Sequence, residues 1–215
     1  MVHNNGSSTI GPNTIMRTLA TVACAILLAA SGRNANASEA LNDTNLFDSL
    51  HYEATLTSGV LFSPFIANGG RPTINYTISE AQFGYILREP RGQGWLRGNF
   101  ELLGEGFGSG IFDGPGGYIA GITLWARYNF VQPGWRFIPY AQAGAGATAT
   151  DINPHIVGQT FNFNLDIGLG TRYLLNQKWA VLLEYRYQHI SNANSGAHNL
   201  GINAHGPILG ICYLF

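Results

Sequence analysis

Charged side chains are scarce in this chain, and lysine is almost absent. Aspartate, glutamate, lysine and arginine together make up 11% of the 215 residues, against roughly 25% in ordinary soluble domains. Lys178 is the only lysine, and the formal net charge is −1. Because a nucleic-acid-binding protein needs a basic surface, the composition argues against nucleic acid as a partner, and it is unusual for a cytosolic protein.

Cysteines and long apolar runs are also few. The two cysteines, Cys24 and Cys212, cannot build a framework of disulfides. After residue 50 no run of 18 apolar residues occurs, which excludes a transmembrane helix in that part of the sequence. What the chain does have is 46% apolar residues, 12% aromatic residues and 28 glycines.

The N-terminus has the pattern of a secretory signal peptide. Met16 and Arg17 precede an apolar stretch over residues 18–31, which is shorter than the roughly 20 residues of a membrane span. The tripeptide ANA at 35–37 fits the small-x-small cleavage rule. Cys24 as a lipoprotein cysteine is the competing interpretation, but the apolar run continues past it.

Long segments of alternating polar and apolar residues fill the rest of the chain, separated by clusters of Gly, Pro and Asn. Several are longer than the usual strand of about five or six residues and reach the roughly 9–11 residues that a transmembrane strand needs. The predicted strands cover residues 51–62, 72–87, 94–106, 117–130, 135–149, 159–174, 178–191 and 202–215.

The predicted connections alternate in length, as in outer-membrane barrels. The short ones are 88–93, 131–134 and 175–177, and the longer ones are 63–71, 107–116, 150–158 and 192–201. The sequence therefore predicts an all-β fold, an eight-stranded antiparallel up-and-down transmembrane β-barrel, with both termini on the periplasmic side. We predict an N-terminal extension and cleaved signal peptide over residues 1–37, with translation starting at Met1 or Met16, and a single barrel domain over 38–215.

The last strand shows the expected faces. Leu209, Ile211, Tyr213 and Phe215 lie on one face, and Ile208, Gly210, Cys212 and Leu214 lie on the other. In the third strand, lipid-facing Leu96, Phe100 and Leu102 alternate with lumenal Arg97, Asn99, Glu101 and Glu105. A soluble lipocalin-like barrel is the alternative fold, but it alternates the opposite way and carries more surface charge.

The end of the seventh strand carries a histidine and a serine on one face. His189 and Ser191 continue the lipid-facing row, because successive strand residues point to opposite faces. Counting back from Phe215 in steps of two places Asn203 and His205 on the same face of the eighth strand. Polar groups that face lipid are costly unless paired, and they usually signal function. His189 can serve as the base for Ser191 in acyl-ester hydrolysis.

These residues resemble the lipid A 3-O-deacylases of the PagL type. The motif H-x-S-N-A is present as HISNA at 189–193, and NLGIN at 199–203 stands where the family has N-x-G-I-E. The resemblance implies an outer-membrane esterase that removes an acyl chain, at the 3-position, from lipid A of lipopolysaccharide in the outer leaflet of the bacterial outer membrane, without a cofactor or metal. The implied catalytic residues are Ser191, His189 and Asn203, with oxyanion or support roles for Asn192, Asn199 and Gly201.

The departure from the family is Asn203, which stands where the family has a glutamate. An amide can hold a histidine tautomer but supplies no negative charge. His205 is the secondary candidate, and Asp151 is a remote carboxylate. Two other interpretations remain: a non-catalytic structural or lipid-binding barrel, and a zinc site made by His189, His198 and His205. The sequence also leaves open which acyl position is cut and whether the chain forms a homodimer.

Overall fold

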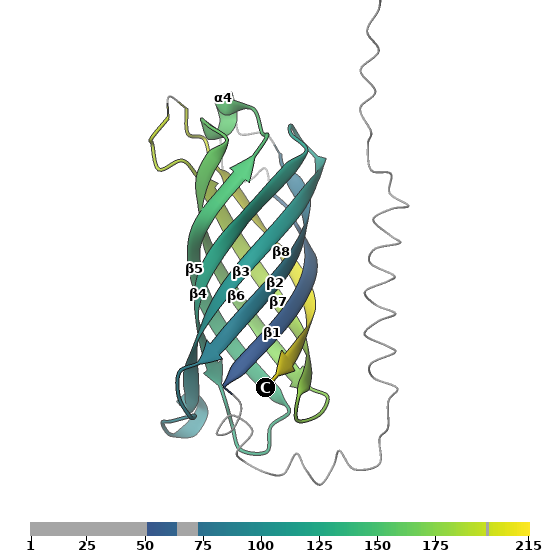
Figure 1. The fold of residues 1–215 in the computed structure, drawn as a ribbon, viewed down its shortest axis with the longest axis vertical. Coiled ribbons are helices and arrows are strands. Elements are labelled where there is room, and N and C mark those ends of the chain that lie inside the picture. Colours follow the sequence, from purple (N-terminus) through teal and green to yellow (C-terminus); the bar gives the residue numbers. More distant parts are fainter. Residues whose placement is uncertain (1–50, 64–72, 197) are drawn as a thin grey trace, which may run out of the picture. The chain divides into compact units, whose positions relative to one another are not determined.

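The chain folds into a closed antiparallel β-barrel in the computed structural model, which describes residues 51–63, 73–196 and 198–215. The strands are β1 (Tyr52–Leu61), β2 (Asn75–Ile86), β3 (Gly98–Asp113), β4 (Tyr118–Phe130), β5 (Phe137–Thr150), β6 (Phe161–Leu174), β7 (Trp179–Ser191) and β8 (Ile202–Leu214). Each strand pairs with the next in the chain, and β1 closes the barrel by pairing with β8 (Figure 1). The predicted eight-stranded up-and-down topology is confirmed.

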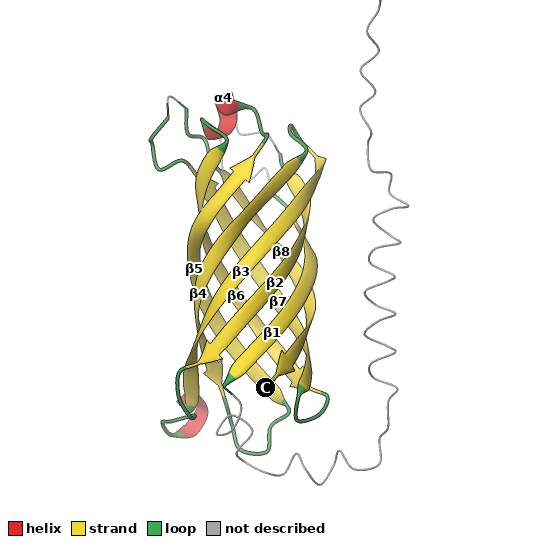
Figure 2. Ribbon diagram, in the orientation of Figure 1, coloured by secondary structure: helices red, strands yellow, loops and turns green. Residues whose placement is uncertain are grey.

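The predicted bounds of β3 are wrong, because the strand continues to Asp113 where a loop was expected from residue 107 (Figure 2). The segment contains alternating glycines, which weaken a strand and favour a turn when they are read in sequence alone. In the barrel, hydrogen bonds to β2 and β4 hold it in an extended conformation over its whole length. The predicted long loop at 107–116 is therefore a short connection at 114–117.

The connection between β2 and β3 is longer than predicted and occupies residues 87–97. It contains a short 3-10 helix, η2 (Gly94–Leu96). Leu96 and Arg97 therefore precede β3, and Arg97 does not face the lumen as predicted. Its Nη1 instead donates to the carbonyl oxygen of Val131 at 2.7 Å, which joins two neighbouring connections. The alternation of polar and apolar residues that predicts the strands gives no sign of this helical turn.

The lumen near the C-terminal end of the barrel holds paired charges. Arg127 Nη1 donates to Glu53 Oε1 at 2.8 Å, and Arg172 Nη2 donates to Glu101 Oε2 at 2.6 Å. Arg172 also forms an ion pair with Glu53. All four side chains are fully buried. Burying a charge is costly unless it is paired and hydrogen-bonded, and this network meets that condition.

A second cluster of charges centres on Arg186 of β7. It pairs with Glu184 at 2.7 Å, with Glu105 at 3.2 Å and with Glu80. The guanidinium group also lies over the Trp125 ring, 4.5 Å from its centroid. Arg186 thus joins carboxylates from β2, β3 and β7 in the lumen. Side chains therefore fill the interior, as expected for a narrow barrel.

Apolar side chains seal both ends of this polar interior. One cluster lies toward the C-terminal end and consists of Ile86, Val131, Ile138, Leu174, Ala180, Cys212 and Leu214. The other lies at the opposite end and includes Ile78, Ile119, Ile190, Ile202 and Ile208, together with Ile152 and Val157 from the β5–β6 loop. That loop carries the short helix α4 (Pro154–Val157). The second cluster anchors the loop across the barrel mouth, beside the end of β7.

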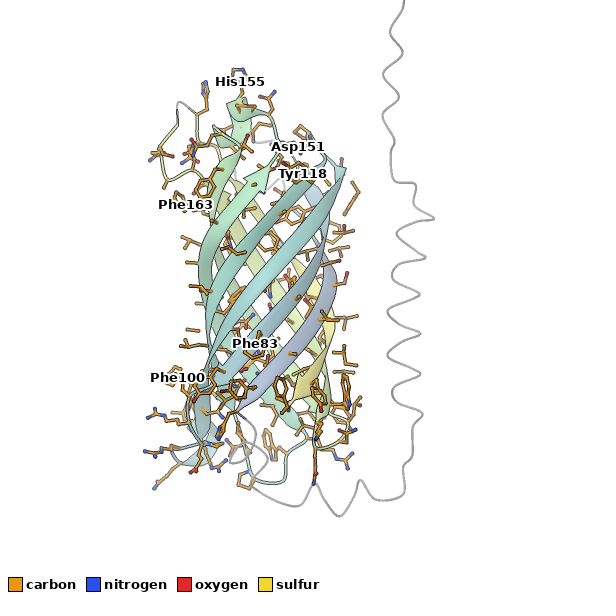
Figure 3. The ribbon with its side chains drawn as sticks, viewed as in Figure 1. Phe83, Phe100, Tyr118, Asp151, His155 and Phe163 are labelled. Carbon is orange, nitrogen blue, oxygen red and sulfur yellow. The ribbon has the colours of Figure 1, made fainter. Side chains whose placement is uncertain are left out.

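The outer face of the barrel is apolar and carries aromatic residues toward both ends. Phe83 and Phe100 lie toward the C-terminal end, and Phe163 and Tyr118 lie toward the end with α4 (Figure 3). All four are at least 44% exposed. Aromatic girdles that flank an apolar band are typical of transmembrane barrels, and this alternation is the opposite of that in a soluble lipocalin-like barrel. Longer loops mark the external end of such barrels, and the β5–β6 loop with α4 and the β7–β8 loop both lie at this end, so we assign it as external.

The described residues contain no helix that is long and apolar enough to cross a membrane. The predicted signal peptide, its cleavage site and Cys24 lie within residues 1–50, outside the described residues, so those expectations stay predictions. Cys212 is a free, buried thiol in the apolar cluster at the C-terminal end.

Candidate active site

The end of β7 and the start of β8 bring the predicted site residues together on the outer wall. His189 of β7 is the direct register partner of Asn203 on β8. Glu184, Arg186 and Gln188 alternate with this row and are buried in the lumen. The outward direction predicted for His189 and Ser191 therefore holds, and both side chains are half-buried.

Three side chains form a continuous hydrogen-bonded line. His189 Nε2 lies 3.1 Å from Ser191 Oγ, and His189 Nδ1 lies 2.6 Å from Asn203 Oδ1. A histidine between a hydroxyl and an acceptor oxygen has the arrangement of a general base that is oriented by a third group. The hydroxyl can pass its proton to Nε2 while Nδ1 keeps its hydrogen bond to the amide oxygen.

Tyr187 is a member of this constellation that the sequence did not reveal. Its hydroxyl donates to Asn203 Oδ1 at 2.9 Å, so that oxygen accepts from two sides. Tyr187 lies two residues before His189, in a row with Tyr185, and both tyrosines fit an aromatic girdle. A tyrosine in such a row can direct its hydroxyl toward a residue on the neighbouring strand. Such a contact can be recognised only when the strand register is known.

The other two histidines of this region have different partners. His205 Nδ1 is hydrogen-bonded to the hydroxyl of Tyr185. The ring of His198 packs against that of His155, with centroids 5.1 Å apart. Within the described part of the chain no group of His, Cys, Asp or Glu side chains converges as a metal site would. The three histidines considered for zinc therefore lie in three separate environments.

Asn192 and Asn199 organise the β7–β8 loop behind Ser191. Asn192 is fully buried, its Nδ2 donates to the carbonyl of His198 at 2.8 Å, and its backbone N–H donates to Asn199 Oδ1 at 3.2 Å. Asn194 adopts a positive φ of 61° and donates its backbone N–H to Asn192 Oδ1. The amide of Asn192 is thus engaged in holding the loop, and does not point free into the site.

Gly201 leaves room beside the histidine and the serine. Its φ is 67°, a conformation that other residues rarely adopt. A methyl group at this position would lie 2.9 Å from the carbonyl oxygen of Ile190, 3.5 Å from His189 Cε1 and 3.6 Å from Ser191 Cβ. The residue therefore ends the loop and borders the space next to both side chains.

The β5–β6 loop packs directly against the β7–β8 loop. The backbone N–H of Leu200 donates to the carbonyl of Ile156 at 2.9 Å, and Gln159 Nε2 donates to Ser195 Oγ at 3.1 Å. Gly158 approaches so closely that a Cβ there would lie 2.0 Å from Asn192 Nδ2. Two loops that are far apart in the sequence therefore form one support for the site.

Asp151, the carboxylate considered as a remote partner for His189, forms its hydrogen bonds with the β3–β4 connection instead. Its Oδ1 accepts from the backbone N–H groups of Gly117 and Tyr118 at 2.8 and 3.0 Å. Partial burial raises the pKa of this carboxyl, but the hydrogen bonds from Tyr118 and Gly117 outweigh it and hold the pKa below its usual value. Asp151 therefore joins the β5–β6 loop to the β3–β4 connection.

An apolar groove lies on the outer wall that β2 to β6 form. Its floor and sides include Ala81, Gly104, Gly106, Ile122, Ala147 and Phe163. Phe163 at the end of this row is the register partner of Ser191, and paired residues on neighbouring strands lie about 5 Å apart. One edge of the groove therefore lies on the strand next to Ser191.

The comparisons with known proteins show the family and the fold. A model of the lipid A 3-O-deacylase (PagL) family matches residues 73–211. The chain belongs to the PagL family. No curated protein sequence matches it. The family match and the fold place the chain among the bacterial outer-membrane β-barrels.

Solved structures share the barrel with this PagL-family chain at low identity. The outer membrane enzyme PagL matches with a TM-score of 0.52 and 17% identity, over 74% of this chain and 97% of that chain. Neisserial surface protein A matches with a TM-score of 0.52 and 14% identity, over 76% and 96%. The N-terminal β-barrel domain of Pseudomonas aeruginosa OprF matches with a TM-score of 0.50 and 17% identity, over 77% and 98%. These likenesses show the fold alone.

Proposed function

We propose that this PagL-family barrel is an esterase that hydrolyses the ester-linked acyl chain at the 3-position of lipid A. The observation that carries the proposal is the hydrogen-bonded line from Ser191 through His189 to Asn203, which lies on the lipid-facing wall. A lipid ester can reach such a site without leaving the bilayer. The apolar groove that includes Phe163, the register partner of Ser191, is suited to hydrocarbon.

The proposed reaction begins with attack by Ser191 Oγ on the ester carbonyl carbon. The hydroxyl proton moves to His189 Nε2 as the new C–O bond forms. When the tetrahedral intermediate collapses, the sugar oxygen leaves and takes that proton from the imidazolium. Water then attacks the acyl-enzyme with His189 again as the base, which releases the fatty acid and restores Ser191.

Asn203 and the loop residues have supporting roles in this proposal. Asn203 Oδ1 accepts the Nδ1–H of His189 and orients the ring, but it offers no carboxylate charge to stabilise the imidazolium. Asn192 and Asn199 hold the loop that follows Ser191 through their mutual hydrogen bond. Gly201 keeps the space beside the ring open for substrate.

The direct test is mass spectrometry of lipid A from cells that express the protein. The intact protein should produce lipid A that has lost one hydroxyacyl chain, and the Ser191→Ala and His189→Ala variants should not. Ser58→Ala is a matched control, because Ser58 also lies on the outer wall but on β1, where it donates to the carbonyl of Ile78. An unchanged lipid A profile with a folded wild-type barrel in the outer membrane would contradict the proposal.

A non-catalytic structural or lipid-binding barrel is the second candidate, and the amide at position 203 favours it. Asn203→Glu separates the two functions, because a carboxylate at this position would stabilise the imidazolium of a genuine site. A serine protease that loses this charge slows about 10⁴-fold, so Asn203→Glu should accelerate ester hydrolysis measurably. A folded Asn203→Glu variant without any gain would favour the structural role.

A further inference from the structure

Asn203 differs from a carboxylate in having two unlike ends. A carboxylate offers two acceptor oxygens, whereas an amide offers one acceptor oxygen and one donor NH₂ group. The end that faces His189 therefore decides which ring nitrogen carries the proton. In the structure the oxygen faces the ring, 2.6 Å from Nδ1.

The orientation of this amide controls whether His189 can act as a base. With Oδ1 toward the ring, Nδ1 carries the hydrogen and Nε2 is free to accept the proton of Ser191. With Nδ2 toward the ring, Nδ1 must accept, so Nε2 carries the hydrogen and donates it to Ser191 Oγ. In that second state the histidine cannot take the proton of the serine.

We infer that Tyr187 is a positioning residue that holds the Asn203 amide with its oxygen toward His189 and so selects the base-competent tautomer. This inference rests on the proposed function. The Tyr187 hydroxyl donates to the same oxygen at 2.9 Å. A phenol donates a hydrogen bond more readily than it accepts one, so the reversed amide would exchange a good hydrogen bond for a poor one.

The strand register explains why this tyrosine reaches the amide. Asn203 lies directly opposite His189, and Tyr187 lies directly opposite His205. Tyr187 and Asn203 are therefore diagonal neighbours, a distance that an aromatic side chain spans. On a lipid-facing wall little water competes for these groups, so each hydrogen bond has more effect than in water.

A carboxylate at position 203 would make the tyrosine unnecessary for tautomer selection, since both carboxylate oxygens accept. The experiment is a double-mutant cycle in the full mature chain, embedded in lipid nanodiscs, with Tyr187→Phe and Asn203→Glu. Phenylalanine keeps the ring in the girdle and removes only the hydroxyl. Tyr187→Phe should lower kcat about five- to tenfold in the wild-type background with little change in KM, and less than about twofold beside Asn203→Glu.

An equal loss of kcat in both backgrounds would overturn the inference, because it would show a packing role for Tyr187. Tyr185→Phe is the matched control. It removes the neighbouring hydroxyl in the same outward row, which is bonded to His205 instead. Tyr185→Phe should leave kcat unchanged in both backgrounds, and a loss as large as that of Tyr187→Phe would also overturn the inference.

A second measurement does not depend on catalysis. The ¹⁵N NMR shifts of labelled His189 report which ring nitrogen carries the proton. The wild-type protein should show the Nδ1–H tautomer, and Tyr187→Phe should shift the population toward Nε2–H, while Tyr185→Phe should not. An unchanged tautomer in Tyr187→Phe would overturn the inference. The expected shift in a protein that cleaves no ester would support the inference and contradict only the proposed function.

Discussion

The lumen and the outer wall of this barrel both hold polar side chains, but of different kinds. The lumen contains arginines and carboxylates that pair with one another and are fully buried. The row on the outer wall, Tyr187, His189, Ser191 and Asn203, contains hydroxyl, imidazole and amide groups and no carboxylate or guanidinium. A charge that faces hydrocarbon has no partner and costs about 2–4 kcal/mol for arginine at midplane, whereas a charge in the lumen is met by its opposite.

The lumenal charges and the outer row also differ in the strands that they connect. The lumenal ion pairs join strands that are distant in the sequence, such as β1, β3 and β6 through Arg172. The outer row joins only β7 and β8, and Ser191 is half-buried on the lipid-facing side. We expect changes in the lumen to affect stability and changes in the outer row to affect activity.

The largest effect should come from Ser191→Ala. Ester hydrolysis should fall at least about 10³-fold, because the proposed nucleophile is lost and the remaining groups of the proposed site act as a unit with it. The free energy of unfolding should stay within about 0.5 kcal/mol of the wild-type value. Hydrolysis of a lipid ester by purified protein and urea denaturation in the same lipid check this. Substantial residual activity would mean that another residue is the nucleophile.

Arg172→Met should show the reverse pattern. Removing the guanidinium takes away one of the two arginines that pair with the buried carboxylates of Glu53 and Glu101, and leaves both carboxylates with Arg127 alone. The free energy of unfolding should fall by about 3–5 kcal/mol, while the kcat of the folded fraction stays unchanged. Arg88→Met is the control, since Arg88 is exposed. A loss of kcat without a loss of stability would contradict the expectation that lumenal residues affect stability and outer-wall residues affect activity.

Gly158→Ala tests the support between the two external loops. The methyl group would meet Asn192 Nδ2 and the carbonyl of His198 at 2.0 Å, so the β7–β8 loop must shift. A displacement of about 1 Å near a catalytic group costs up to about 10²-fold in rate, and we expect a loss of at least tenfold in kcat. Gly134→Ala is the control, with a similar positive φ of 73° but nothing within 4 Å. Equal effects of both variants would attribute the loss to backbone strain.

His205→Ala should have the smallest effect. Its ring is hydrogen-bonded to Tyr185 and lies outside the line from Ser191 to Asn203. We expect kcat to change by less than about twofold, as for substitutions away from a site. Comparison of kcat with the wild type checks this, and a tenfold loss would extend the functional row to His205.

Most of the strand bounds, and the side-chain directions at the end of the seventh strand and in the eighth, could be predicted from the sequence. Alternation of polar and apolar residues depends on the strand period of two, which needs no knowledge of neighbours. The prediction failed at β3, where alternating glycines resemble a loop and only pairing with β2 and β4 keeps them extended. It also failed at Arg97, because η2 interrupts the alternation before the strand begins.

The candidate site could be predicted only in part, for the same reason. His189 and Ser191 share one strand, so their common direction follows from the sequence. The motif resemblance and the strand phase predicted that Asn203 lies near them, and the register of β7 and β8 places its oxygen 2.6 Å from His189. Tyr187 was missed because a tyrosine in an aromatic row gives no sign of its hydrogen-bond partner.

The barrel, its apolar outer face and the outward direction of His189 and Ser191 follow from the amino-acid sequence, because they depend on local periodicity. The tertiary structure alone decided which side chains on different strands meet. Contacts such as Tyr187 with Asn203, or Gly158 with Asn192, join segments whose spacing depends on register and loop packing. Their atoms must approach within a few ångströms, and no period in a single segment specifies that.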